Sequence, residues 1–272
     1  MSLAAETKVA GETTPGSAAR GWKGLASDIG RVYARPSELF GELPLQNRAA
    51  SAMLVLIVLH MLYGAAVIST GVVDYEVDSA SQKDINRFVR EREGDSKAQQ
   101  LTVEIDALEK GAVFSRLLRR VQLVVSGPVR LIAGLAVLSG VLFVTVAMKG
   151  GKPNFPVLAG VVVFAGFVEP ARLLVRLLLI SQLQTSRIET SAAAFVDSPE
   201  VGLVGFLLLR RLDPFELWYW FLIGLGIWRT EQLSRRAAIV AAVVLGVLAA
   251  ALSCGAEVAD FADMRGVTLG RS

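Results

Sequence analysis

Five apolar stretches fill most of the chain after residue 48, and they constrain the fold more than any other feature of the sequence. Each is long enough, or nearly long enough, to cross a bilayer as a helix of about 20 apolar residues. Hydrocarbon contains no water, so a spanning segment must satisfy its backbone polar groups internally, as a helix does. The sequence therefore predicts an all-α polytopic membrane protein with five transmembrane helices, over residues 49–73, 128–148, 155–181, 213–228 and 237–254.

The segment before the first span divides into two parts. Residues 1–20 are small and polar without an apolar core, which predicts a disordered tail and no cleaved signal peptide. In residues 21–48, apolar side chains from Trp22 onward recur at helical spacing as far as Pro36, which predicts an amphipathic cytoplasmic segment. Its helix lies either on an anionic membrane surface or against the protein's own cytoplasmic face.

The longest polar stretch, residues 74–127, predicts a charged helical hairpin followed by an interfacial helix. Residues 93–96 break the hairpin, and Ser126-Gly127-Pro128 interrupts the helix before the second span. The thin apolar stripes of the hairpin either zip its two helices together or dock another membrane or extracytoplasmic protein. The connector 182–212 carries a second interfacial helix, and residues 255–272 form a C-terminal tail.

The placement of Lys and Arg predicts the orientation, because basic residues flank the cytoplasmic ends of spans. With five spans, three basic groups fall on one side of the membrane, which puts the N-terminus in the cytoplasm and the C-terminus outside. Arg116 and Arg210 run against this assignment, since they lie near the outer interface. The three groups are Arg31, Arg35 and Arg48; Lys149 and Lys152; and Arg229, Arg235 and Arg236.

Three charged residues fall inside the third predicted span. Glu169, Arg172 and Arg176 share one helical face, and each charge at a helix centre costs about 2.5–3.5 kcal/mol on insertion scales. They require a wet or protein-facing environment, and Pro170 is expected to kink the helix beside them. Alternatively, the span ends near Val168, and Glu169 opens a tilted continuation at the interface. Two interpretations stay open: a polar pathway for an ion or lipid headgroup, or an internal ion pair, with Arg130 as a further partner.

The last span carries a stripe of small residues at every fourth position, which lets a second helix approach closely. The stripe predicts internal helix packing or, alternatively, self-association into a homo-oligomer. His60 lies in the middle of the first span and is expected to be a hydrogen-bonded packing residue or a proton relay. The stripe consists of Ala238, Ala242, Gly246, Ala250 and Cys254.

Composition and motifs exclude several classes of function. A single His and a single Cys leave no set of metal ligands, and no catalytic or cofactor motif is visible, so no enzyme, cofactor or metal is expected. The net charge of +3 is explained by basic residues that flank spans, so nucleic acid is not expected as a partner. The bilayer itself is the partner that the sequence predicts most directly.

The entry to the fourth span has a distinctive pattern. Asp213 is an N-cap, Pro214 occupies the first helical position, and Trp218 belongs to an aromatic interfacial belt that Phe215 and Glu216 precede. This Leu-Asp-Pro-Phe-Glu-Leu-Trp sequence, followed by glycines and a Ser-Arg-Arg loop, resembles the prokaryotic form of the Yip-domain family. Residues 35–40 also resemble that family's lead into its first span.

The resemblance implies a five-span integral membrane protein in a bacterial inner membrane, without catalytic residues. Eukaryotic members are linked to Rab-type GTPases, vesicle formation and membrane shaping, but this chain lacks their Asp-Leu-Tyr-Gly-Pro element, so GTPase binding is not carried over. The expected function is a non-enzymatic membrane scaffold, assembly or membrane-organising factor. The alternative is a small transporter or channel with a polar pathway around Glu169, Arg172 and Arg176.

Overall fold

The computed structural model describes residues 15–43, 48–91, 98–185, 188, 190–196, 205–206 and 208–269. Every regular element in this part of the chain is helical. The elements are α1 (Pro15–Ala34), α2 (Pro36–Glu42), α3 (Ala49–Ser69), α4 (Val72–Glu91), α5 (Ala98–Met148), α6 (Phe155–Ala165), α7 (Val168–Leu183), the 3-10 helix η2 (Ala192–Phe195), α9 (Pro214–Arg229) and α10 (Arg235–Leu269).

Within the described residues, four helical segments are long and apolar enough to cross a membrane: Ala49–Ser69, Ile105–Met148, Phe155–Leu183 and Arg235–Cys254. They match the predicted first, second, third and fifth spans. The predicted fourth span is α9, which is helical over 16 residues and packs between α6 and α10. The all-helical membrane class is therefore confirmed, and α9 is the element on which the predicted count of five depends.

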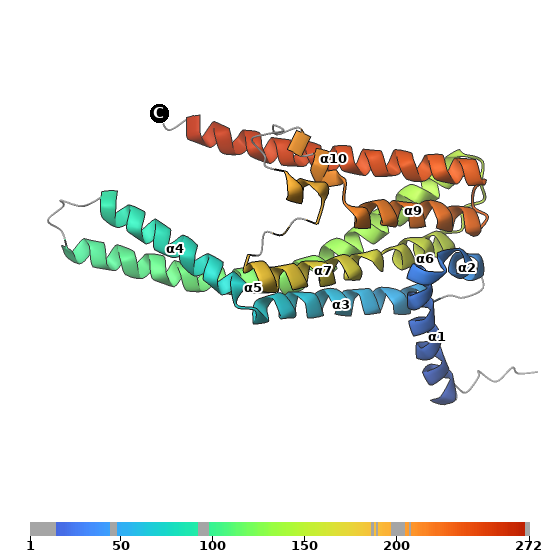
Figure 1. Cartoon of the computed structure of the whole chain (residues 1–272), viewed down its shortest axis with the longest axis horizontal. Helices are drawn as coiled ribbons and strands as arrows, with labels where there is room; N and C mark the ends of the chain where they lie inside the picture. Colours follow the sequence, from blue (N-terminus) through green and yellow to red (C-terminus); the bar gives the residue numbers. More distant parts are fainter. Residues whose placement is uncertain are drawn as a thin grey trace, which may run out of the picture.

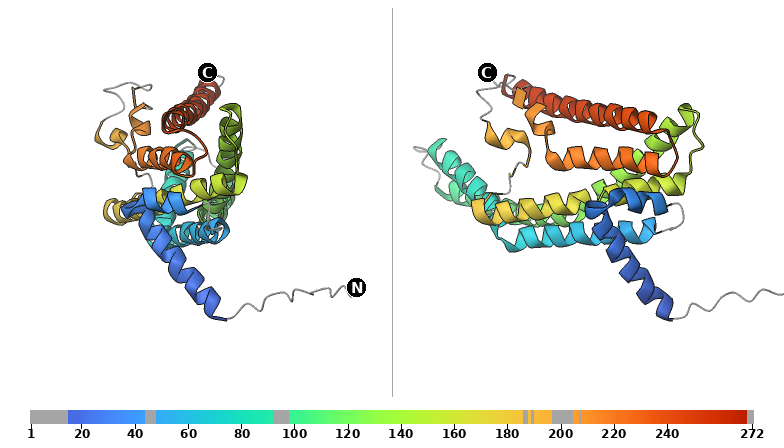
Figure 2. Two further views of the ribbon diagram at one scale, coloured as in Figure 1. Left: turned by 90° about the vertical axis from the view of Figure 1, so that its right-hand side faces the viewer. Right: turned by 45° about the vertical axis from the view of Figure 1, so that its right-hand side comes forward.

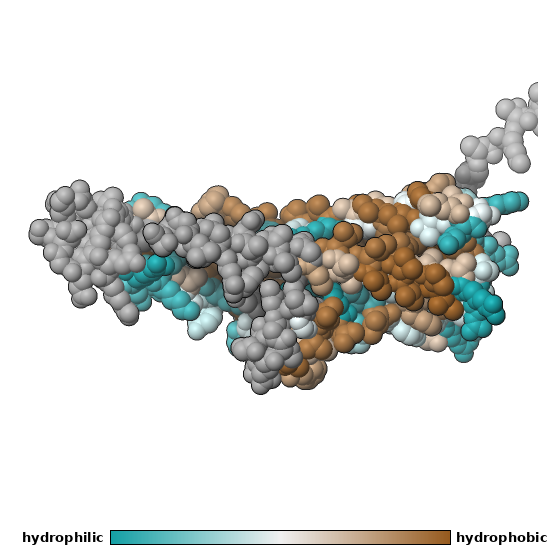
Figure 3. Space-filling model, turned by 90° about the horizontal axis from the view of Figure 1, so that it is seen from above, coloured by the Kyte–Doolittle hydropathy of each residue, from teal (hydrophilic) through white to brown (hydrophobic). Residues whose placement is uncertain are grey.

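The long helices run lengthwise in one bundle, whereas α1 crosses it at one end (Figures 1 and 2). The core lies where α3, α5, α6 and α9 meet, around the fully buried Leu56, Leu142, Phe164 and Ile223. Apolar side chains cover the middle of the bundle, and hydrophilic residues gather at the end that carries α2 (Figure 3). This banding is the surface that a bilayer requires of a protein crossing it.

The second span differs from its prediction. A single helix, α5, runs through Pro128, so the expected break at 126–128 and the separate interfacial helix before it are wrong. Pro128 is buried against the bundle, and Gly127 lies beside His60 of α3. Membrane helices tolerate such residues because neighbouring helices support the backbone where its own hydrogen bond is lost.

The third span breaks at Gly166 and Phe167, ahead of the proline that was expected to kink it. Pro170 instead falls in the first turn of α7, where a missing backbone N–H removes no helical hydrogen bond. The hydroxyl of Tyr33 on α1 donates to the carbonyl oxygen of Phe167 at this break. The interruption of the span is therefore stabilised from a helix outside the bundle.

Several other helix ends differ from the predicted ones. Helix α1 starts at Pro15, inside the expected tail, whose residues 1–14 lie outside the described part. Helix α3 ends at Ser69, because Gly71 turns the chain with a φ of +73° and α4 follows immediately. Helix α10 continues to Leu269, so most of the expected C-terminal tail is helical. Of the interfacial helix predicted before residue 213, only residues 205–206 and 208–212 are described, and 205, 206 and 208–211 are helical.

Candidate functional site

The side chain of Asp213 is the best-buried charged group among the ion pairs of the structure, with 1% of its surface exposed. Asp213 is the N-cap of α9, and its Oδ1 accepts a hydrogen bond of 2.9 Å from the backbone N–H of Phe215. Its Oδ2 accepts from the hydroxyl of Thr190 at 2.8 Å. Both carboxylate oxygens are thus engaged, which is what burial of a charge requires.

Arg172 joins this carboxylate to α7. One Nη lies 2.9 Å from Asp213 Oδ2, and the other lies 3.5 Å from the carboxylate of Glu169. Its Nε donates to the hydroxyl of Thr190 at 3.4 Å. We call Glu169, Arg172, Thr190 and Asp213 the clasp, because they connect α7, the connector after it and the start of α9.

The clasp lies well inside the bundle rather than at its end. Arg172 is one turn into α7, which packs against both α3 and α9. Thr190 and Ala192, which lie between α7 and α9 in the sequence, reach this level, because Thr190 binds Asp213 and the backbone N–H of Ala192 donates to Leu212 O at 3.1 Å. Irregular backbone among spanning helices is tolerated where protein surrounds it.

The other residues predicted with this cluster lie around it. Arg176 points its Nε into a buried position, and within the described chain neither this atom nor the buried Oγ of Ser191 has a hydrogen-bond partner. Arg130 is exposed on α5, and no ion pair among the described residues joins it to Glu169. The structure therefore brings Glu169 and Arg172 together with Asp213 and leaves Arg130 apart.

The remaining residues of the α9 entry face different surroundings. Pro214 is exposed and Phe215 packs against the core, while Trp218 is partly exposed and stacks on Phe221 with ring centroids 5.1 Å apart. Glu216 lines a groove between α9 and α10. Only Asp213 of this motif takes part in the clasp.

The small-residue stripe of α10 packs against α9 at one end and opens at the other. Ala238 and Ala242 are buried, and a Cβ on Gly224 of α9 would lie 3.0 Å from that of Ala242. Gly246 contacts the ring of Trp220, where a Cβ would lie 3.2 Å away. The stripe continues into the half-exposed Ala250 and Cys254. Its first half therefore packs within the chain.

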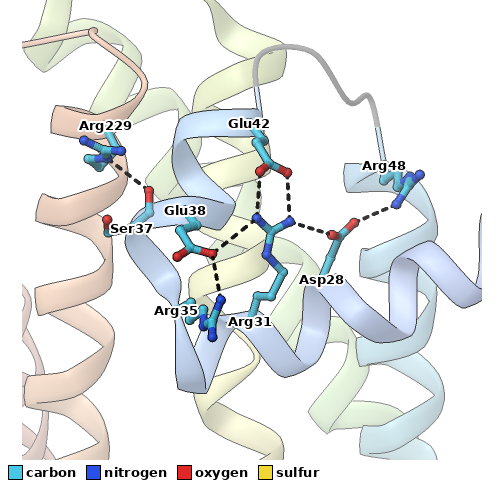
Figure 4. A network of polar contacts seen from close by, with 8 residues as sticks. All are labelled: Asp28, Arg31, Arg35, Ser37, Glu38, Glu42, Arg48 and Arg229. Atoms are coloured by element: carbon cyan, nitrogen blue, oxygen red, sulfur yellow. Dashed lines mark hydrogen bonds and ion pairs between the residues drawn. The ribbon is translucent and has the colours of Figure 1, made fainter.

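A second network, which the sequence did not reveal, joins α1 and α2 to the bundle (Figure 4). Arg31 binds Glu42 through two hydrogen bonds of 2.8 Å, and Arg48 at the start of α3 binds the buried Asp28 at 2.8 Å. Arg229, the last residue of α9, donates to the carbonyl oxygen of Ser37 at 3.0 Å. We call this set the N-terminal cluster: Asp28, Arg31, Arg35, Glu38, Glu42 and Arg48.

The charges of the N-terminal cluster stabilise one another. The hydrogen bonds from Arg31 lower the pKa of Glu42 below its ordinary value, and the same contact raises the pKa of Arg31. Gly24 permits the packing of Arg48, because a Cβ at this position would lie 2.4 Å from the guanidinium. The signal in the sequence was the spacing of three between Asp28 and Arg31, which places them on one helix face.

The chemistry available at these two networks is ion pairing and hydrogen bonding. In the described part of the chain, no group of three or more His, Cys, Asp or Glu side chains could hold a metal ion. Arg172 lies between two carboxylates, so its charge is compensated inside the protein. This arrangement favours the interpretation of the cluster as an internal ion pair that fixes helix packing.

Comparison with known protein families gives a match to the Yip1 domain over residues 30–255. The match covers far more than half of the chain and confirms the family to which the α9 entry pointed. Comparison with curated proteins and with solved structures gave no match.

Proposed function

Because this chain belongs to the Yip1 domain family of membrane proteins, we propose that it is a non-enzymatic membrane scaffold that organises a partner protein and the bilayer around it. The observation that carries this proposal is the length of α5. The part of α5 from Ile105 to Met148, which contains its apolar spanning window, is 44 residues long, about 66 Å at 1.5 Å per residue, against a hydrocarbon core of about 30 Å. A large part of α5 therefore extends beyond the bilayer.

The projecting part of α5 is paired with α4 as a hairpin. Arg120 binds Asp74 through two hydrogen bonds, and Arg116 lies 2.8 Å from Asp78. The hydrogen bonds from Arg120 also lower the pKa of Asp74. These contacts support the interpretation that the hairpin zips onto itself.

The same hairpin leaves a surface for a partner. Val113, Phe114 and Leu117 on α5 are 60%, 63% and 60% exposed, and neighbouring apolar residues extend this patch. A groove of about 930 Å³ runs between α4 and α5, with Tyr75, Phe114 and Arg119 among its lining residues. Exposed apolar surface outside hydrocarbon is typical of a protein-binding site. The two helices of the hairpin therefore pack on each other and also leave a surface for a partner protein.

At the other end, α1 is suited to the membrane surface. Leu25 and Val32 dock on the bundle and the hydroxyl of Tyr33 binds Phe167 O, whereas Trp22 stays exposed. The helix crosses the lengthwise bundle (Figure 1), so it runs along the membrane plane if the bundle spans the bilayer. An amphipathic helix in this position inserts aromatic side chains among headgroups.

The proposed topology has five spans, with α9 as the fourth. The turns at 149–154 and 230–234 lie at the same end as α2, and the backbone N–H of Asn154 donates to the side chain of Gln232 at 3.0 Å. Basic residues cluster at this end, so we assign it to the cytoplasm, with α10 ending outside. The proposed location is a bacterial inner membrane.

The partner is tested by photocrosslinking in native membranes. A photoreactive phenylalanine analogue at Phe114, on the hairpin patch, is compared with the same analogue at Phe143, farther along α5 beside Phe155. The proposal expects one near-stoichiometric protein adduct from position 114, identified by mass spectrometry, and none from position 143. No protein adduct at 114, or the same adducts at both positions, contradicts the scaffold role.

The alternative function, that of a transporter, requires water to reach the clasp. A polar pathway requires Glu169 to be hydrated, so a cysteine at this position should react with a membrane-impermeant maleimide in a Cys254→Ser background. The scaffold proposal expects protection of residue 169 and no ion flux in liposomes. Labelling together with flux that Glu169→Gln abolishes would establish the transporter instead.

A further inference from the structure

A groove of about 510 Å³ runs along the contact between α9 and α10. Its wall is almost entirely apolar, with Trp220 and Phe221 from one helix and Val243 and Val247 from the other. The groove extends along α9 from Glu216 to Trp228, about 18 Å at 1.5 Å per residue. It is therefore long and narrow, and it lies on two helices that we place in the membrane.

The packing of the two helices explains why the groove exists. Gly224 lies against Ala242, and Gly246 lies against the ring of Trp220, so the backbones approach closely on one side. Two residues of α10 beside these contacts leave space in the groove: Ala250 has a small side chain, and Val247 is 63% exposed. The contacts between α9 and α10 keep this groove open without a bound molecule.

The two ends of the groove differ in charge. Arg211 and Glu216 lie at one end and have opposite charges. At the other end Arg235 lies over the ring of Trp228, 5.2 Å from its centroid, and Arg236 follows it. Arg229 lies on the same ring and donates to Ser37 O. The Arg235 end is thus strongly positive and the opposite end is balanced.

We propose that this groove binds one acyl chain of an anionic phospholipid, with the phosphate group at Arg235. A positive end complements the headgroup, and an apolar wall of about 18 Å suits a chain that crosses one leaflet of about 15 Å. The aromatic ring of Trp228 lies at the level where headgroup and chain meet, a position that tryptophan favours. This inference rests on the proposed placement of α9 across the membrane.

The charge at one end of the groove favours a lipid over a second copy of the chain. The phosphate group of an anionic lipid is a counter-charge for Arg235 at this end, whereas the apolar face of a second copy's spanning helix supplies none.

Quenching by brominated lipids tests the site directly. The chain has four tryptophans, so Trp22→Phe and Trp218→Phe leave Trp220 and Trp228, both in the groove, as reporters. The protein is reconstituted in phosphatidylcholine with increasing fractions of brominated phosphatidylglycerol, or of brominated phosphatidylcholine in parallel. We expect half-maximal quenching at a several-fold lower fraction of the anionic lipid.

Paired variants separate the headgroup contact from the chain contact. Arg235→Gln removes the anionic preference, whereas Arg235→Lys and the neighbouring Arg236→Gln retain it. Val247→Phe fills the groove and weakens quenching by both lipids, whereas Val244→Phe, on a residue that does not line it, leaves quenching unchanged. An unchanged melting temperature shows that each variant is folded.

Three outcomes overturn the proposal. Equal quenching by both lipids, unaffected by Arg235→Gln, means ordinary bilayer contact only. Protection of both tryptophans that grows with protein density, together with dimers in light scattering, means that a second copy covers the groove. Labelling of cysteines at both ends of α9 from the same side of the membrane removes the topology on which the site depends. None of these results bears on the hairpin crosslink, so the two proposals fail separately.

Discussion

The clasp and the N-terminal cluster are both built on arginine–carboxylate pairs, yet they differ in their access to water. In the clasp, Arg172 and Asp213 are 25% and 1% exposed and lie within the bundle. In the N-terminal cluster, Arg31 and Glu42 are 23% and 47% exposed, whereas the pair of Arg48 with Asp28 is 34% and 6% exposed. A buried pair is screened much less than an exposed pair, which responds to salt and pH.

This difference assigns the two networks different roles. The clasp joins α7 to α9 through a single fully compensated arginine, so it fixes the arrangement of spans that every other feature requires. The N-terminal cluster holds α1 and α2 against the bundle by contacts nearer the surface, beside the buried Val32 and Phe40. We therefore expect the clasp to matter for the stability of the whole bundle and the exposed pairs of the N-terminal cluster to matter for the local attachment of α1 and α2.

Loss of the buried carboxylate is the largest expected effect. Asp213→Ala leaves Arg172 without its closest partner and removes the N-cap of α9. Breaking a buried pair in this way costs about 3–5 kcal/mol, so we expect the melting temperature in detergent to fall by about 10 °C or more. Static light scattering during a thermal ramp measures this shift.

Two further variants serve as controls for Asp213→Ala. Asp78→Ala breaks the exposed pair with Arg116 and should shift the melting temperature little. The double variant Arg172→Met with Asp213→Leu removes both charges, and a large part of the stability should return. If Asp213→Ala and Asp78→Ala had equal effects, the clasp would not be a buried ion pair in the membrane-embedded protein.

The outer network should show a local effect instead of a global one. Arg31→Ala removes the two hydrogen bonds to Glu42 and the contact with Asp28. We expect several-fold faster hydrogen exchange in residues 22–42, with the melting temperature of the bundle unchanged. Arg35→Ala is the matched control, because Arg35 makes one exposed contact of 3.7 Å. A fall in melting temperature as large as that of Asp213→Ala would remove the distinction between the networks.

The sequence predicted the helical membrane class and both halves of the clasp but could not join them. Hydropathy marks spans directly, since charge is excluded from hydrocarbon. Glu169 and Arg172 stood out as charges inside a span, and Asp213 stood out as an N-cap. Their contact is a tertiary one between the first turn of α7 and the start of α9, which no periodic pattern in the sequence predicts.

The predictions that failed have a common physical cause, which is contact between helices. Ser126-Gly127-Pro128 ends a helix in water, but α5 passes through because His60 and its helix pack against this point. Conversely, Pro170 was expected to kink the third span, yet the break at Gly166 and Phe167 precedes it and lies close to the alternative end predicted near Val168. Contacts with neighbouring helices decide whether a helix continues at such glycines and prolines. The N-terminal cluster was missed because its members come from three helices and share no single spacing.

Acid should release the contact between Arg31 and Glu42. The pKa of Glu42 is lowered by Arg31, so this pairing is fully present above the ordinary glutamate pKa of about 4.3 and is lost as pH falls through the lowered value. A spin label at Ala26→Cys, in a Cys254→Ser background, should gain mobility only when the pH falls below the ordinary glutamate pKa. Glu42→Gln should show the mobile spectrum already at neutral pH. Mobility that rises between pH 5 and 7 would assign the transition to another group.

The weakest contacts of the N-terminal cluster should matter only at low salt. Glu38 lies 3.9 Å from Arg31 and 3.7 Å from Arg35, and it is 53% exposed. Such exposed pairs contribute little, and they are screened more at 0.15 M salt, where the Debye length is about 8 Å, than at 0.01 M, where it is about 30 Å. Glu38→Gln should therefore leave the Ala26 spin-label spectrum unchanged at physiological salt and increase mobility slightly at low salt. A large change at physiological salt would mean that Glu38 shares the attachment of α1 equally with Glu42, and the boundary between the fixed and the releasable network would then have to be drawn around α2 as a whole.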